Sequence, residues 1–238
     1  MEGSKGWWDD GYILVSVIYL AYIALSLIGI AVGFQASESV YLVLIFSIIP
    51  VLLVIVMYLI WKREWKQFGF HLSISNTDFL LYMPLLMLLL IVGWDGFYAL
   101  EVEMVLFYGI YAILTGFIQE TFFRSILIKQ LEEKGTLIAV LIPSFLYTFV
   151  LWFQFYGGQG FFPVFQLVML SFLFAVVMSQ VFLLTRNIIP LIIFHCFFSF
   201  FQFISKEMNM ILTVVYLLYL ILLIVFYYYV LKNRKEKL

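Results

Sequence analysis

The sequence predicts an all-α fold, a polytopic membrane helix bundle with about eight transmembrane helices and both termini in the cytoplasm. Composition is the first observation behind this prediction. The chain has 238 residues, of which 66% are hydrophobic and 11% are charged, whereas a soluble domain is about 45–50% apolar and about 25% charged. The second observation is that the apolar residues form long continuous runs. A membrane β-barrel would instead show alternating polarity, so helices are predicted to satisfy the backbone in lipid.

A helix needs about 20 mainly apolar residues to cross a bilayer. Eight segments qualify, of which the third is short and the fourth is long enough to project beyond the hydrocarbon. They are residues 12–33, 40–61, 79–95, 104–130, 137–156, 164–185, 188–205 and 209–230. No internal repeat or low-complexity linker divides them. Residues 1–238 are therefore predicted to form one domain, with short cytoplasmic tails at 1–11 and 231–238.

The distribution of basic residues is the third observation, and it predicts the orientation. Eleven of the 13 basic residues fall on one side of the predicted spans, while Lys206 lies on the other side and Arg124 lies within a span. Because basic loops stay in the cytoplasm, both termini are predicted to be cytoplasmic in a multi-pass protein of the cell membrane. The eleven are Lys5, Lys62, Arg63, Lys66, Lys129, Lys134, Arg186, Lys232, Arg234, Lys235 and Lys237.

The segments outside the spans carry weaker signals. Residues 1–11 lack a basic run, and no small-residue cleavage signature follows the first span, so this span is expected to be retained. Loop 62–71 combines tryptophans with lysines, which is typical of an interfacial segment, and His71 within it is interpreted as a surface histidine. Ser75 is expected to cap the third span. The basic tail 232–237 is interpreted as a topology anchor, with binding to anionic lipid as the alternative.

Composition also limits the possible chemistry. The net charge of -1 indicates no nucleic-acid partner. Cys196 is the single cysteine, which excludes an internal disulfide and a cysteine metal cluster. The only histidines are His71 and His195, so any imidazole chemistry must use one of these two.

The stretch 116–125 contains Glu120 and Arg124, the only charged residues that lie away from the ends of the predicted spans. A charge at the bilayer centre costs about 2.5–3.5 kcal/mol on insertion scales. The two residues are four apart, so on a helix they face the same side, and Gln119 adds a polar group beside them. The cluster is therefore expected to face the interior of the bundle.

The predicted topology places His195 at the same depth as Glu120. Glu120 lies nine residues before Lys129, about 13 Å from that end of its span, and His195 lies eight residues after Asn187, about 12 Å from the same side. Ser199 follows His195 by four residues and shares its face.

Two interpretations of this cluster remain open. In the first, Glu120 acts as a base that activates water, His195 orients or ligates, and Arg124 holds the acid or a developing oxyanion. In the second, Glu120 and Arg124 form a purely structural pair, and His195 bonds a backbone or hydroxyl oxygen.

The sequence Gln119-Glu120-x-x-x-Arg124 resembles the Glu-Glu-x-x-x-Arg motif of the CPBP family of CAAX-type prenyl endopeptidases and bacteriocin-processing or self-immunity (Abi) membrane proteins. The run from Asn187 to Pro190, followed by His195-x-x-x-Ser199, resembles the last motif of that family, His-x-x-x-Asn/Asp. Residues 143–147 resemble the lead-in to its middle motif, Phe-x-x-x-His. The resemblance covers about residues 60–205 and implies a bacterial intramembrane protease-like protein.

The chain departs from the motifs of the family at three positions. Gln119 replaces the first glutamate, to which the family resemblance assigns water activation, and Ser199 replaces the final asparagine. The histidine of the middle motif is missing, since the two possible alignments place Leu151 or Phe153 there. No cofactor is clearly implied. A divalent metal such as zinc would find only Glu120 and His195 as strong ligands, whereas catalytic zinc usually takes three.

Three hypotheses for function follow. The first is a catalytically impaired protein of this family that binds a membrane-associated peptide or a membrane protein, in bacteriocin self-immunity or in regulation of a membrane protein. The second is an active glutamate- or metal-dependent intramembrane peptidase that uses Glu120, Arg124 and His195. The third is a small transporter, although the spans lack the paired Gly/Pro-broken helices of two symmetric halves.

Overall fold

The computed structural model describes residues 10–35, 47–157 and 160–235. Most of these residues lie in helices, and none of them forms a β-strand beyond an isolated bridge between Phe97 and Ser205. The order is α1 (Asp10–Gln35), α3 (Ile49–Lys62), α4 (Asn76–Val92), α5 (Val102–Gln119), the π-helix η2 (Glu120–Ile126), α6 (Leu127–Leu131), the 3₁₀-helix η3 (Glu132–Lys134), α7 (Thr136–Phe149), the 3₁₀-helix η4 (Val150–Gly157), α8 (Phe161–Thr185), α9 (Ile189–Ile204) and α10 (Met210–Lys235).

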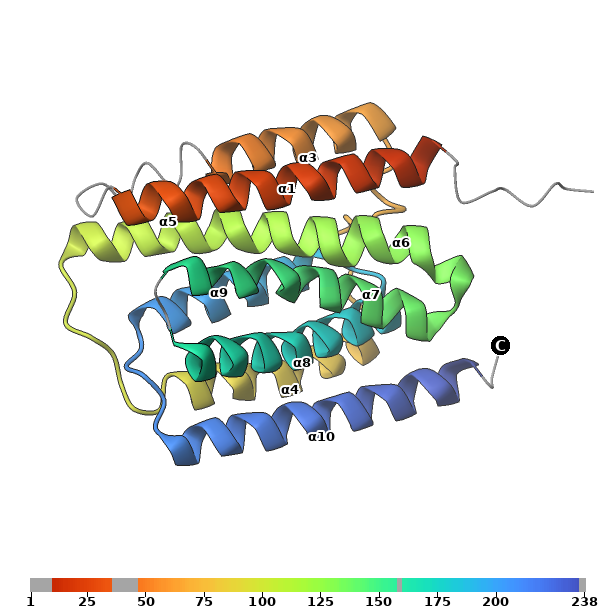
Figure 1. The fold of residues 1–238 in the computed structure, drawn as a ribbon. Coiled ribbons are helices and arrows are strands. Elements are labelled where there is room, and N and C mark those ends of the chain that lie inside the picture. The colour runs from red at the N-terminus through yellow and green to blue at the C-terminus, as the bar shows by residue number, and fades with distance from the viewer. Residues whose placement is uncertain (1–9, 36–46, 158–159, 236–238) are drawn as a thin grey trace, which may run out of the picture.

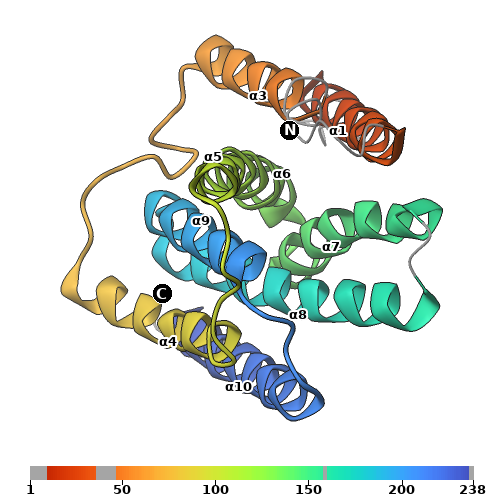
Figure 2. The same cartoon turned by 90° about the vertical axis from the view of Figure 1, so that its left-hand side faces the viewer.

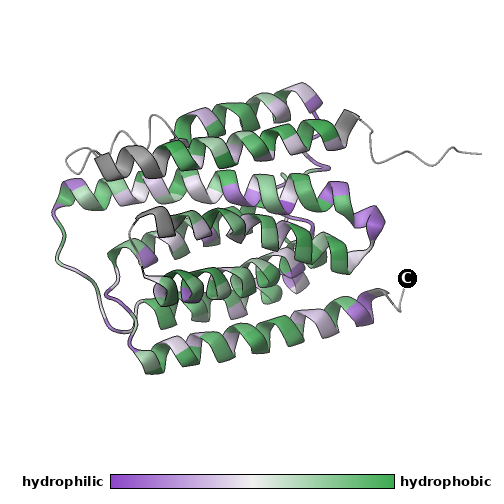
Figure 3. Cartoon of the chain, in the orientation of Figure 1, coloured by the Kyte–Doolittle hydropathy of each residue, from purple (hydrophilic) through white to green (hydrophobic). Residues whose placement is uncertain are grey.

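Each of the eight predicted apolar segments forms a helix over most of its described residues, although the third ends early, at Val92, and is followed by a turn. Residues 40–46 of the second segment lie outside the described residues. The fifth segment changes at Val150 from α-helix to 3₁₀-helix. Within the described ranges, four helices are long and apolar enough to cross a membrane, and four shorter apolar helices accompany them. Figure 3 shows that hydrophobic colouring dominates the helices. The chain is thus an all-helical protein with the helices of a membrane bundle.

The helices pack roughly side by side along one direction (Figure 1). Viewed end-on in Figure 2, α1 and α3 form an outer layer over the continuous helix α5–η2–α6, and α4 and α10 lie on the opposite side of the bundle. Between them, α5 packs against α9, α7 packs against α8, and α8 packs against α10. This arrangement places the helix that carries Glu120 in direct contact with the helix that carries His195.

Two apolar cores meet around η2. The larger core joins buried side chains of α4, α8, α9 and α10, including Phe174 and Phe198. The smaller core joins α1 and α3 to the end of α5 and to η2, including Phe122 and Phe123. Burial of apolar side chains stabilises a helix bundle through packing when the surroundings are themselves apolar. The polar residues of η2 therefore lie at the boundary between two well-packed regions.

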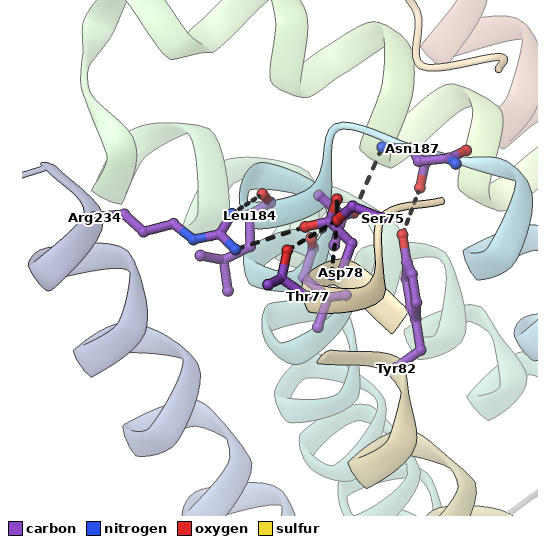
Figure 4. Close-up of polar contacts among 9 residues, drawn as sticks. Ser75, Thr77, Asp78, Tyr82, Leu184, Asn187 and Arg234 are labelled. Carbon is purple, nitrogen blue, oxygen red and sulfur yellow. Dashed lines mark hydrogen bonds and ion pairs between the residues drawn. The ribbon is translucent and has the colours of Figure 1, made fainter. Parts of the chain in front are cut away.

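A polar clamp formed by Ser75, Asp78 and Arg234 fastens the end of α10 to the start of α4 (Figure 4). The Ser75 hydroxyl accepts a hydrogen bond from the Asp78 backbone N–H at 3.1 Å, which confirms the predicted helix cap. Arg234 Nη2 lies 3.6 Å from Asp78 Oδ1, and Arg234 Nη1 donates to the Leu184 carbonyl oxygen at 2.7 Å. Arg234 thus links three helix ends, a role that its interpretation as a topology anchor did not include.

Candidate functional site

The helix that carries Glu120 changes its hydrogen-bonding pattern at this residue. The α-helix α5 ends at Gln119, and Glu120–Ile126 form the π-helix η2, in which backbone hydrogen bonds run from residue i to i+5. Residues four apart still share a face in this wider turn. The α-helical spacing assumed from the sequence is therefore corrected, while the shared face of Glu120 and Arg124 is retained. Both side chains are completely buried, with 0% exposure.

The structure brings Glu120, Arg124 and His195 into one buried network. His195 Nδ1–H donates to Glu120 Oε1 at 2.5 Å, and Arg124 Nη1 lies 3.5 Å from the same oxygen. The side chain of His195 is 3% exposed. Because Nδ1 donates its proton to the carboxylate, Nε2 carries the lone pair in the neutral imidazole. The contact agrees with the matched depths of Glu120 and His195, whereas the catalytic role of the three residues stays a prediction.

Close approach of α5 to α9 sets the distance between Glu120 and His195. Gly116 lies one turn before Glu120, and Cys196 directly follows His195. A Cβ atom built on Gly116 would lie 2.8 Å from Cys196 Sγ and 3.1 Å from the Cys196 backbone nitrogen. The Cys196 thiol also donates to the Ile113 carbonyl oxygen at 3.7 Å. Small residues at helix interfaces allow backbones to approach closely, so Gly116 holds the two helices at hydrogen-bonding range.

Aromatic rings enclose the network, and sequence reasoning gave them no role in it. The Arg124 guanidinium carbon lies 4.7 Å from the centroid of the Tyr147 ring, a cation–π contact. The centroids of the Tyr147 and Phe174 rings lie 6.4 Å and 5.5 Å from that of His195. In the sequence, Tyr147 is distinguished only as part of the run 143–147, which resembles the lead-in to the middle motif. As one of 16 tyrosines in an apolar chain, it gave no stronger signal.

Several buried polar atoms of the network have no hydrogen-bond partner in the described part of the chain. They are Glu120 Oε2, the three nitrogens of the Arg124 guanidinium and Thr121 Oγ1. Buried polar atoms in proteins are nearly always hydrogen-bonded, because leaving one unpaired costs about 1–3 kcal/mol. The arrangement therefore has unused acceptor and donor capacity, with which it can bind a hydrogen-bonding ligand or water.

The remaining predicted site residues lie near the network without joining it. Gln119 is half-buried, and its side chain is within hydrogen-bonding range of the Tyr22 hydroxyl on α1. Ser199 is buried one turn after His195, but no hydrogen bond joins it to Glu120, Arg124 or His195. Leu151 and Phe153, the two candidates for the middle histidine position, are both half-buried in η4.

Loop 62–71 fastens both helices of the network from the basic end of the bundle. The Ser125 hydroxyl of η2 donates to the Phe68 carbonyl oxygen, and the Ile188 N–H at the start of α9 donates to the Gly69 carbonyl oxygen at 2.9 Å. Gly69 has φ +84°, and a Cβ there would lie 3.0 Å from the Arg186 carbonyl oxygen, so only glycine fits without strain. Adjacent carbonyls of one loop thereby hold the two helices in register.

Two further contacts complete the attachment of this loop. His71 Nε2 lies 3.0 Å from the Arg186 carbonyl oxygen, so the imidazole has a structural hydrogen bond at the bundle surface. Lys129 Nζ lies 2.8 Å from Glu64 Oε2, and this hydrogen bond holds the pKa of Glu64 below its usual value. Both groups are partly exposed, so their ion pair is worth about 0–1 kcal/mol.

The residues of the network do not fit a catalytic zinc. No group of three or more His, Cys, Asp and Glu side chains comes together in the described residues in a way that would hold a metal. Glu120 and His195 provide two such side chains, and Nδ1 of His195 is used in the bond to Glu120. Catalytic zinc normally takes three protein ligands. The network therefore offers fewer ligands than a catalytic zinc takes.

The fold and the site together define a helical membrane protein with a buried Glu–Arg–His network. Residues 101–201, which contain all three side chains, match the family model of the Rce1-like proteins, described as Type II CAAX prenyl endopeptidase Rce1-like. The resemblance inferred from the motifs is confirmed over these residues. Comparison with curated proteins and comparison with solved structures found no match.

The close approach at Gly116 gives the first testable prediction. Gly116→Ala is expected to destabilise the protein by about 1–3 kcal/mol, since the new methyl group would overpack the contact with Cys196. Thermal unfolding of the purified protein in detergent measures the effect. Gly109→Ala on the same helix is the matched control, because its Cβ would have only Phe200 Cε2 nearby, at 3.9 Å. Equal stability of the two variants would contradict the tight α5–α9 contact.

A second prediction compares a buried charge pair with an exposed one. Arg124→Met leaves Glu120 with a single partner, and breaking a buried pair in this way costs about 3–5 kcal/mol. Arg186→Met removes the partly exposed pair of Arg186 with Glu132 and is expected to cost less than about 1 kcal/mol. Unfolding in detergent again gives both values. Similar losses for both variants would show that the network does not depend on the Arg124 charge.

Proposed function

We propose that this protein is a catalytically impaired relative of the CAAX-type prenyl endopeptidases that works by binding a membrane-associated peptide or a membrane protein. Bacteriocin self-immunity or regulation of another membrane protein is the role it would serve. The observation that carries the proposal is that the carboxylate of Glu120 is already engaged by its neighbours. It is the one carboxylate in the network, and His195 and Arg124 both contact its Oε1.

Two features of the network support the loss of peptidase activity. Gln119 stands where the family resemblance expects the water-activating glutamate, and an amide cannot accept the proton. Neither Leu151 nor Phe153 can position water or stabilise an oxyanion as a histidine would. Losses of this kind cost about 10²–10⁴ in rate each and do not simply add. The complete burial of Glu120 also separates it from water.

An active peptidase is the second candidate, and one observation favours it. Glu120 Oε2 and the Arg124 nitrogens are buried and have no hydrogen-bond partner among the described residues. A water or substrate carbonyl admitted beside them would find an acceptor for a proton and donors for a developing negative charge. In this alternative, Glu120 replaces the missing first glutamate of the motif.

We also propose that all eight apolar helices cross the membrane, with both termini in the cytoplasm. Three shorter apolar helices, Ile49–Lys62, Asn76–Val92 and Ile189–Ile204, have 14, 17 and 16 residues, and the apolar stretch Tyr12–Ile28 belongs to α1, which has 26 residues. Tilt, bilayer thinning and snorkelling flanking residues allow short apolar helices to span. The basic residues around loop 62–71 and η3 support the orientation.

The orientation gives a prediction that cysteine labelling can check. In a Cys196→Ala background, Trp65→Cys and Glu132→Cys are expected to react with a membrane-impermeant maleimide only after the cells are permeabilised. Glu101→Cys, in the loop at the opposite end of the bundle, should react in intact cells. Labelling of positions 65 and 132 from outside intact cells would reverse the topology.

The choice between the two functions gives a further prediction. The purified protein should show no cleavage of a prenylated CAAX peptide above background, because Glu120, the carboxylate of the network, is buried and already paired with His195 and Arg124. Protection of cells, measured against a panel of bacteriocins, should survive Glu120→Gln and fall in Gly116→Ala, which disturbs folding. Membrane abundance and helix content serve as controls. If Glu120→Gln or His195→Ala abolishes protection while both controls stay normal, that side chain is chemically required. Such a result would contradict the proposal that the protein is catalytically impaired.

A further inference from the structure

A cavity of about 220 Å³ lies beside the buried network, between α7, α8, α9 and α10. Gln166 and Gln202 are exposed at its rim, near the start of α8 and the end of α9. Phe174, Phe198 and Tyr216 are almost fully buried and form its deep part. The cavity therefore runs from one end of the bundle toward its interior.

The deep part of the cavity is separated from the network by a single layer of aromatic rings. Tyr147 and Phe174 line the cavity, and the same two rings contact His195. Tyr147 also lies under the guanidinium of Arg124, which is fully buried and has three nitrogens without hydrogen-bond partners. A molecule in the cavity would thus lie one ring away from the buried Glu120 and Arg124.

The cavity lining selects an uncharged ligand that forms hydrogen bonds. Its polar groups are two carboxamides and three hydroxyls, and none of its lining residues is charged; they are Gln166, Gln202, Ser171, Tyr147 and Tyr216. Carboxamides and hydroxyls both donate and accept, as a peptide backbone requires. An ion would lose its hydration here without gaining a counter-charge. The volume is below the range of about 300–1,000 Å³ typical of sites for drug-sized ligands. Only a short segment of an extended chain would therefore fit inside the cavity.

The rim of the cavity lies at the end of the bundle opposite the basic loops. The Tyr98 N–H donates to the Ile204 carbonyl oxygen at 2.8 Å, and the Lys206 N–H donates to the Gly96 carbonyl oxygen at 3.0 Å. These bonds place the end of α9 beside the loop that contains Asp95 and Glu101. The proposed orientation puts this loop outside the cytoplasm.

We propose that this cavity binds a short uncharged peptide segment that arrives from outside the cytoplasm. The inference rests on the proposed function, because it names the side and the chemistry of the partner that the impaired protein would bind. A peptide that enters here meets amides and hydroxyls at the rim and apolar rings within. Such a partner is neutral over the segment that enters the cavity, whatever charges it carries elsewhere.

The test uses the full-length protein in intact cells, with Gln202→Cys in the Cys196→Ala background. An impermeant maleimide is expected to label position 202 without permeabilisation. The probe is an N-acetylated pentapeptide amide of alanine, valine and leucine, and the control probe has two of its residues replaced by lysine. The neutral probe should slow labelling at least several-fold, and the charged probe should not. Labelling only after permeabilisation, or a rate that the neutral probe does not change, overturns the proposal.

A pair of variants separates filling of the cavity from general damage. Ser171→Phe places a ring inside the cavity, and it is expected to abolish the effect of the neutral probe on labelling at position 202. Val215→Phe adds a ring on the exposed face of α10 and should leave the effect unchanged. An unchanged probe effect in Ser171→Phe contradicts binding in this cavity. These results do not depend on the result for Glu120→Gln. The proposal that the cavity binds a peptide and the proposal that catalysis is lost can therefore be contradicted separately.

Discussion

The carboxylate of Glu120 has no access to solvent, and the surrounding structure is arranged to compensate it. A buried charge is tolerated only when an opposite charge and hydrogen bonds replace its lost hydration. Arg124 supplies the charge from the next turn of η2, and His195 supplies the shortest hydrogen bond from α9. That bond requires α5 and α9 to approach at Gly116, where no side chain intervenes. The close contact between the two helices thus makes the hydrogen bond to this carboxylate possible.

The buried charges are only partly compensated among the described residues. A structural pair gains most when each donor and acceptor is used, since partly satisfied networks are costly. Here the guanidinium of Arg124 stacks on Tyr147 and is near the carboxylate, yet its nitrogens lack hydrogen-bond partners. The aromatic layer keeps these groups dry while leaving them adjacent to a polar cavity. Under the proposed function, such a centre would serve to bind a partner.

The sequence predicted the parts of the structure that depend on composition and local spacing. Continuous apolar runs predicted the helices, Ser75 predicted a cap, and residue counting from Lys129 and Asn187 placed Glu120 and His195 at one level. Other features arise only from packing between segments distant in the chain. The i→i+5 bonding of η2, the ring of Tyr147 under Arg124 and the reach of Arg234 to Leu184 have no local signature. The contact of Gly116 with Cys196 could not be predicted either, because the sequence around each residue does not indicate which residue it packs against.

The π-helix has a geometric consequence for the chain that follows it. An i→i+5 turn accommodates one more residue than an α-helical turn, so every side chain after η2 is rotated relative to a helix that continued as α. Glu120 contacts His195 of α9 and Arg124 contacts Tyr147 of α7, whereas Ser125 and Lys129 contact the loop that holds Phe68 and Glu64. The continuous helix α5–η2–α6 thereby presents one set of side chains to the bundle interior and a second set to the loop at the end of the bundle. Removing a single residue from this turn would rotate the second set relative to the first, so that the two sets could no longer both reach their partners.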